Sequence, residues 1–65
     1  MCDYALVVIK ENGEEQKLLE SVDEVIKENN TYIAKNIFGE QVVINGVFER
    51  FDGSNNLLKF RITKQ

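Results

Sequence analysis

Histidine and proline are absent from this chain of 65 residues, and cysteine occurs once, as Cys2. The absence of histidine removes the commonest general base and the commonest metal ligand. A single cysteine excludes a disulfide within the chain, and the four glycines form no phosphate-binding loop. The chain therefore lacks both a nucleophile paired with a histidine base and a phosphate-binding loop, so we predict that it is not an enzyme.

Long apolar runs and basic clusters are also missing. The longest apolar run, residues 4–9, has strand length and falls far short of the roughly 18 residues that a membrane span needs. Eight basic residues stand singly among eleven acidic ones, for a net charge of −3, which disfavours binding to nucleic-acid phosphates. The start Met1-Cys2-Asp3 lacks the basic segment of a signal peptide. With the unpaired cysteine, this predicts a cytoplasmic location.

The small size of the chain predicts one domain, over residues 1–65, and a need for extra stabilisation. A domain of this length buries only about 60% of the surface that its unfolded chain exposes. Small domains are commonly supported by disulfides, a metal or a partner subunit. Because no disulfide can form, metal binding or dimerisation is expected.

Turn residues recur between short apolar segments, which is typical of an all-β domain. The clearest hairpin signal is Asn45-Gly46, because both residues tolerate the positive φ of a tight turn. A bend or bulge is expected at Ser21-Val22. Strands are predicted at 4–10, 16–20, 23–28, 31–37, 40–44 and 47–52, followed by a last strand with Leu58, Phe60 and Ile62 on one face.

The fold class predicted from this pattern is a small antiparallel barrel or bent meander of six to seven strands, of the SH3 or Sm kind. One alternative stays open, because residues 14–29 are rich in helix formers and place apolar side chains at helical spacing. The first strand is apolar on both faces, so one of its faces is a candidate subunit interface.

Cys2 is the one chemically distinctive residue, and two interpretations of it stay open. Free cysteine is commonly a small buried apolar residue, so Cys2 could simply pack. Its position next to the chain start also allows the thiolate to chelate a metal together with a backbone or terminal nitrogen, either its own or that of Met1. Nitrogen and sulfur donors of this kind suit Ni(II) or Cu(II), and also attract Cu(I) and Zn(II). Two copies of Cys2 could complete one site in a two-fold dimer.

The ordered motifs of the chain resemble the CooT family of small nickel-binding proteins. The resemblance begins with Met1-Cys2 and an aliphatic strand, and it ends with Gly46, an acidic residue at Asp52 and an apolar last strand. Between them lie the Leu19-Glu20-Ser21-Val22 step and the Asn36-Ile37-Phe38-Gly39-Glu40 turn. It implies a homodimeric β-barrel whose Cys2, with the Met1 amine, binds Ni(II). It also implies that Gly39 and Gly46 form turns and that Phe38 is a core residue.

The resemblance further implies a role as a nickel chaperone, store or sensor, with carbon monoxide dehydrogenase maturation as the associated process. The alternative is an Sm-like barrel that binds RNA or a protein partner, with Cys2 only structural. In that case Tyr4, Tyr32, Phe48 and Phe51 would stack bases, and Lys59 and Arg61 would meet phosphates.

Overall fold

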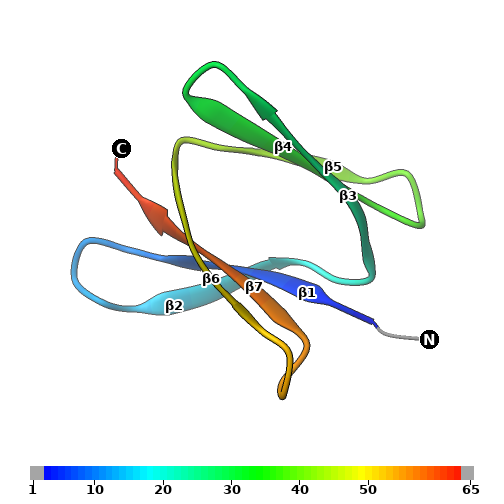
Figure 1. The fold of residues 1–65 in the computed structure, drawn as a ribbon, viewed down its shortest axis with the longest axis horizontal. Coiled ribbons are helices and arrows are strands. Elements are labelled where there is room, and N and C mark those ends of the chain that lie inside the picture. Colours follow the sequence, from blue (N-terminus) through cyan, green and yellow to red (C-terminus); the bar gives the residue numbers. More distant parts are fainter. Residues whose placement is uncertain (1–2, 64–65) are drawn as a thin grey trace.

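The computed structural model describes residues 3–63, which form seven strands (Figure 1). No helix forms among these residues, so the helical alternative for 14–29 is wrong. The strands are β1 (Ala5–Ile9), β2 (Glu15–Leu19), β3 (Val22–Glu28), β4 (Thr31–Asn36), β5 (Gln41–Ile44), β6 (Gly46–Asp52) and β7 (Leu57–Ile62). All seven predicted strands are therefore present, within a few residues of their predicted ends.

The strands form two separate sheets, with order β2-β1-β7-β6 in one and β3-β4-β5 in the other. Figure 1 shows the two groups lying apart, with β3, β4 and β5 on one side. No hydrogen-bonded strand pair among residues 3–63 joins the sheets, so they do not close into a barrel. Among the described residues, no helix is long and apolar enough to span a membrane.

The prediction of an all-antiparallel arrangement is wrong at the centre of the first sheet. β1 and β7 pair in parallel, with Leu6 opposite Leu58 and Val8 opposite Phe60. The remaining pairs are antiparallel. Parallel neighbours need a long crossover connection, and here β2 to β6 and both turns of the second sheet lie between them.

The core lies between the sheets and is built from both. Its buried members are Leu6, Val8, Leu19, Ala34, Ile44 and Phe60. Phe60 is only 2% exposed, and its ring meets Tyr32 edge to face with centroids 4.9 Å apart. Aromatic pairs in this geometry contribute more free energy than their buried area alone, so this contact stabilises the packing of the first sheet against the second.

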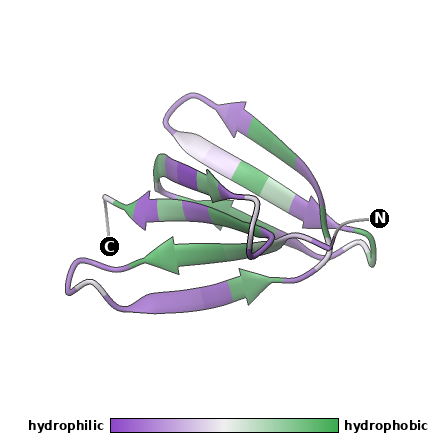
Figure 2. Cartoon of the chain, turned by 60° about the horizontal axis from the view of Figure 1, so that its bottom comes forward, coloured by the Kyte–Doolittle hydropathy of each residue, from purple (hydrophilic) through white to green (hydrophobic). Residues whose placement is uncertain are grey.

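β1 is buried on both faces, as its apolar sequence predicts. Figure 2 shows β1 hydrophobic along its whole length, whereas β7 alternates between hydrophobic and hydrophilic residues. On the outer face, Val7 lies between Lys17 and Lys59 in register and is buried. Long lysine stems cover apolar surface while the ammonium group stays in water. The outer face of β1 is therefore largely buried within the single chain, and its role as a subunit interface stays a prediction.

The Asn45-Gly46 hairpin prediction is also wrong, because β5 and β6 belong to different sheets. Gly46 is the first residue of β6 and has no positive φ. A Cβ atom there would overlap the carbonyl oxygen of Arg61 on the paired strand β7. Glycine is thus required for a close backbone approach at the point where the chain passes between sheets, rather than for a turn.

Candidate functional site

The two predicted metal ligands, Met1 and Cys2, lie outside the described residues. The described chain nearest to them is held at Tyr4, directly before β1. The carbonyl of Tyr4 accepts a hydrogen bond from the Val22 amide at 2.8 Å, and the Ala5 amide donates to Asn56 at 2.9 Å. These two bonds fix the start of β1 between the Ser21 bend and the β6–β7 turn.

An aromatic contact adds to this anchoring. The Tyr4 ring meets the Phe51 ring of β6 edge to face, with centroids 5.2 Å apart and an interplanar angle of 61°. Tyr4 is half-buried, whereas Phe51 is 53% exposed. The Tyr4 side chain therefore reaches past β7 to the exposed strand β6.

The Ser21 bend is confirmed, and it shapes the same end of the molecule. Ser21 has a φ of 56°, which is uncommon for a residue other than glycine. Its carbonyl accepts a hydrogen bond from the Ile37 amide at 3.1 Å, which links the bend to the β4–β5 turn. The bend at Ser21, between β2 of the first sheet and β3 of the second, thus also helps to position the β4–β5 turn, whose sequence resembles the family motif.

The β4–β5 turn is organised by the buried side chain of Asn36. Its Oδ1 accepts hydrogen bonds from the amides of Phe38 and Glu40, at 3.1 and 2.8 Å. Its Nδ2 donates to Glu40 Oε1 at 2.7 Å. Gly39, with a φ of 84°, takes a conformation that favours glycine, so its predicted role as a turn residue is confirmed.

Phe38, which the resemblance places in the core, is 72% exposed at the tip of this turn. The prediction is wrong: in the turn conformation that the hydrogen bonds of Asn36 stabilise, the Phe38 side chain points to solvent. Ile37 beside it is also exposed. The turn thus presents two exposed apolar side chains on a hydrogen-bonded backbone.

No group of three or more potential metal-ligating Cys, His, Asp or Glu side chains occurs within residues 3–63. Two grooves of the described chain, of about 420 and 310 Å³, are open to solvent. The larger one lies between the β3–β4 turn and the start of β6, and no carboxylate or thiol lines it. Thus the described side chains alone offer no metal site.

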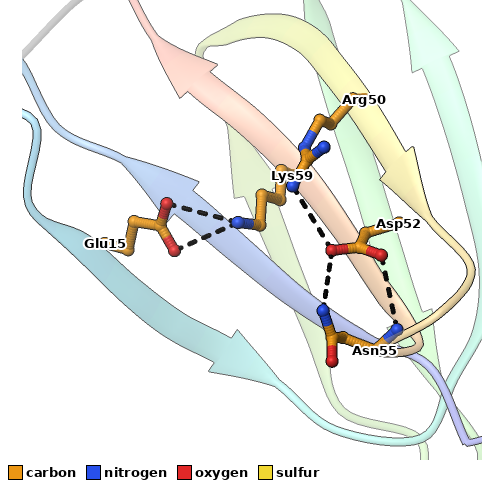
Figure 3. Close-up of polar contacts among 5 residues, drawn as sticks. All are labelled: Glu15, Arg50, Asp52, Asn55 and Lys59. Carbon is orange, nitrogen blue, oxygen red and sulfur yellow. Dashed lines mark hydrogen bonds and ion pairs between the residues drawn. The ribbon is translucent and has the colours of Figure 1, made fainter.

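The cations on which RNA binding would depend are engaged with carboxylates. Lys59 Nζ lies 3.3 Å from Glu15, across β1, and its side chain is mostly buried (Figure 3). Arg61 meets Glu49 through two nitrogens, at 3.0 and 3.2 Å, which lowers the pKa of Glu49 and raises that of Arg61. Both cations would have to exchange a carboxylate for a phosphate, which disfavours RNA on this face.

The acidic residue at Asp52 has a structural role at the end of β6. Its side chain accepts hydrogen bonds from the amide and the side-chain nitrogen of Asn55, at 3.3 and 3.0 Å, and lies 3.3 Å from Arg50 (Figure 3). The hydrogen bonds from Asn55 lower the pKa of the Asp52 carboxyl. Asp52 therefore stabilises the β6–β7 turn, in which the carbonyl of Asn56 accepts the hydrogen bond from the Ala5 amide.

Comparison with known proteins identifies the class of small β proteins to which this arrangement belongs. The fold matches the crystal structure of a protein assigned as CooT from Carboxydothermus hydrogenoformans, with a TM-score of 0.83 and 22% sequence identity. That match covers 97% of this chain and 100% of the other. No curated protein matches the chain significantly.

The family follows from the sequence match. The model of the family described as CO dehydrogenase accessory protein CooT matches residues 1–57. The chain belongs to the CooT family, which confirms the resemblance drawn from its motifs. The family is named for an accessory protein rather than for a catalyst.

Proposed function

We propose that this chain is a cytoplasmic Ni(II)-binding homodimer that carries, stores or senses nickel for the maturation of carbon monoxide dehydrogenase. The observation that carries the proposal is the family match, which begins at residue 1 and so includes Met1-Cys2. The family name supplies the connection to CO dehydrogenase. In this proposal nickel is cargo, held by the thiolate of Cys2 together with an amine or amide nitrogen at the chain start.

The chemistry of the chain supports a nitrogen and sulfur ligand set. Cys2 is the only thiol, and histidine is absent. The described side chains form no alternative cluster of ligands. One cysteine leaves a nickel ion with few strong donors, whereas two chains together supply two thiolates and their neighbouring nitrogens. Square-planar N/S donation suits Ni(II), so the proposal joins metal binding to dimerisation.

A titration of tag-free protein with Ni(II) tests the proposal. We expect ultraviolet thiolate-to-nickel charge-transfer bands that grow on titration and are lost in Cys2→Ser. Native mass should show a dimer that carries nickel. Binding should strengthen as pH rises from about 6 to 9, because the α-amine and the thiol, with pKa values of about 7.7–8.0 and about 8.5, must lose protons.

A matched control moves the thiol without changing its number. In Cys2→Ser/Asn30→Cys the single cysteine lies on the exposed β3–β4 turn, at the far end of β3 from the start of β1. This variant should show no charge-transfer bands at the same nickel concentration. Equal bands in the control, or affinity that stays flat with pH, would contradict the ligand set.

A further inference from the structure

The groove of about 420 Å³ is lined by both sheets. The β3–β4 turn and the start of β4 contribute to it from the second sheet, and the start of β6 and Thr63, just after β7, from the first. Figure 1 shows these segments on one side of the molecule and the start of β1 on the other. Ala5 lies opposite Leu57, which precedes Thr63 by about 20 Å of extended strand. The groove is therefore separate from the start of β1.

Lys27 supplies the positive charge of this groove. Its ammonium group has no carboxylate partner within residues 3–63, whereas five other cations of this part of the chain are paired with carboxylates: Lys17, Lys35, Arg50, Lys59 and Arg61. The chain carries a net charge of −3, yet no carboxylate lines the groove. The charge of Lys27 is therefore available to a ligand.

The register of the second sheet explains why Lys27 lies on the groove side. Lys27 is opposite Tyr32, and Tyr32 is opposite Ile44. Directly opposite residues share a face, and Ile44 is buried in the core, so Lys27 belongs to the inner face of its sheet. Successive residues of a strand alternate between faces, so the carboxylates of Glu24 and Glu28 lie on the outer face.

Neutral polar side chains accompany this charge. Asn30, Asn45 and Thr63 line the groove with exposed side chains that make no hydrogen bond within the described chain. Amide and hydroxyl groups of this kind donate hydrogen bonds to oxygen atoms. Tyr32 and Val47 add apolar surface. A concave site with an apolar wall and a few convergent polar groups is typical of small-molecule binding, for which volumes of about 300–1,000 Å³ are usual.

We propose that this groove binds a small organic anion, whose carboxylate or phosphate oxygens meet Lys27 and whose body lies against Tyr32. A lysine ammonium group pairs as a point charge with either kind of oxyanion, so the negatively charged oxygen is the chemistry that the groove recognises. The lining belongs to both sheets, which no strand pair joins within residues 3–63. A bound anion therefore adds a polar link between the sheets and should raise the melting temperature.

An amide NMR titration of the metal-free full chain at low ionic strength tests the proposal. The probes are benzoate, phenyl phosphate and benzamide, which has the shape of benzoate without its charge. We expect saturable shifts of the Tyr32, Gly46 and Thr63 amide signals with an anion, and a dissociation constant at least about fivefold higher for benzamide. The anion that binds more tightly identifies the headgroup as carboxylate or phosphate. Equal binding of benzamide, or shifts that scatter over the surface and do not saturate, would overturn the site.

Removal of the charge gives a second test. Lys27→Gln keeps much of the length of the side chain and should raise the dissociation constant of the tighter anion at least about fivefold. The matched control Lys35→Gln makes the same change in net charge on the outer face of the same sheet, where Lys35 lies opposite Gln41, and should bind as the wild type does. Unchanged binding in Lys27→Gln would overturn the proposal and leave Lys27 as an inward charge that protects the free edge of β3.

Addition of a charge makes the test independent of Lys27. Asn45→Asp keeps the shape of the side chain but places a carboxylate in the groove, and it leaves the Asn45 carbonyl free to accept its hydrogen bond from Thr63. Saturable binding and the rise in melting temperature should both be lost. Gln41→Glu adds the same charge outside the groove, at an exposed position of β5, and should retain both. Binding of the anion to Asn45→Asp with wild-type affinity would contradict the site.

The anion site goes beyond the proposed function and is tested separately from it. Cys2→Ser should lose the nickel charge-transfer bands but bind the anion with unchanged affinity, because no thiol lines the groove. Loss of anion binding in this variant would overturn the separation of the two sites. Lys27→Gln should in turn leave the nickel titration unchanged.

Discussion

Strands β1 and β6 flank β7 in the same sheet and both contain several apolar residues, yet they differ in solvent exposure. β1 is buried over Leu6–Ile9, whereas most of β6 is exposed. The difference comes from position. β1 has a strand on each side and lysine stems over its outer face, while β6 ends the sheet. Apolar content is therefore buried in the core in β1, whereas in β6 it lies largely at the surface.

The largest effect is expected from Phe60→Ala on β7, which removes the ring that lies opposite both Val8 of β1 and Phe48 of β6. Loss of a buried phenylalanine typically costs about 3–5 kcal/mol, and a chain of this size has only about 3–10 kcal/mol of stability in total. We expect a chain that is largely unfolded or has a much lower urea midpoint. Phe38→Ala, at an exposed ring, should change the free energy of unfolding by less than about 0.5 kcal/mol.

If Phe38→Ala proved as costly as Phe60→Ala, the assignment of the core to the space between the sheets would be wrong. Urea unfolding followed by tyrosine fluorescence gives both free energies.

A smaller effect is expected from Gly46→Ala at the beginning of β6. The added methyl group overlaps the Arg61 carbonyl oxygen, so β6 must move away from β7. Overpacking of this kind typically costs about 1–3 kcal/mol. Gly53→Ala in the β6–β7 turn, where an added Cβ meets only the Phe51 ring at 3.4 Å, is the matched control. Thermal unfolding of the two variants measures the difference, and equal melting temperatures would contradict the close approach.

The smallest effect concerns pH. The end of β6 is stabilised by polar contacts of Asp52, which titrates, whereas β1 is stabilised by apolar burial, which does not depend on pH. The hydrogen bonds from Asn55 keep the pKa of Asp52 in the folded chain below its unfolded value. Their contribution to stability is therefore present above the unfolded pKa and is lost as pH falls below about 4. Asn55→Ala should lower stability slightly at pH 6, and the difference from wild type should shrink at pH 3. A difference that grew on acidification would reverse the assigned sign.

The strands were predictable from sequence because alternation, apolar runs and turn residues are local signals. The Ser21 bend and the Gly39 turn were predictable for the same reason. Pairing was not, because the strand that lies beside β1 depends on contacts made far along the chain. The parallel β1–β7 pair and the separation of β5 from β6 were therefore not predicted. Asn45-Gly46 has the sequence of a turn, but Gly46 is required for the close approach to the Arg61 carbonyl on β7.

The candidate site was predictable only in part. The composition left Cys2 as the only thiol, and the family resemblance is confirmed, but metal binding at Met1 and Cys2 stays a prediction. Phe38 was misplaced because an aromatic residue in a turn gives no local sign of whether it points inward.

The parallel pairing of β1 with β7 has a consequence for synthesis on the ribosome. β1 emerges early and can pair at once with β2, but the strand that completes its other side is the last of the seven to be made. Until then its buried residues have only part of their packing, and the nascent chain cannot reach its folded state. A chain that stalls or is cut before Leu57 should consequently be a target for chaperones and proteases rather than a shortened but working protein.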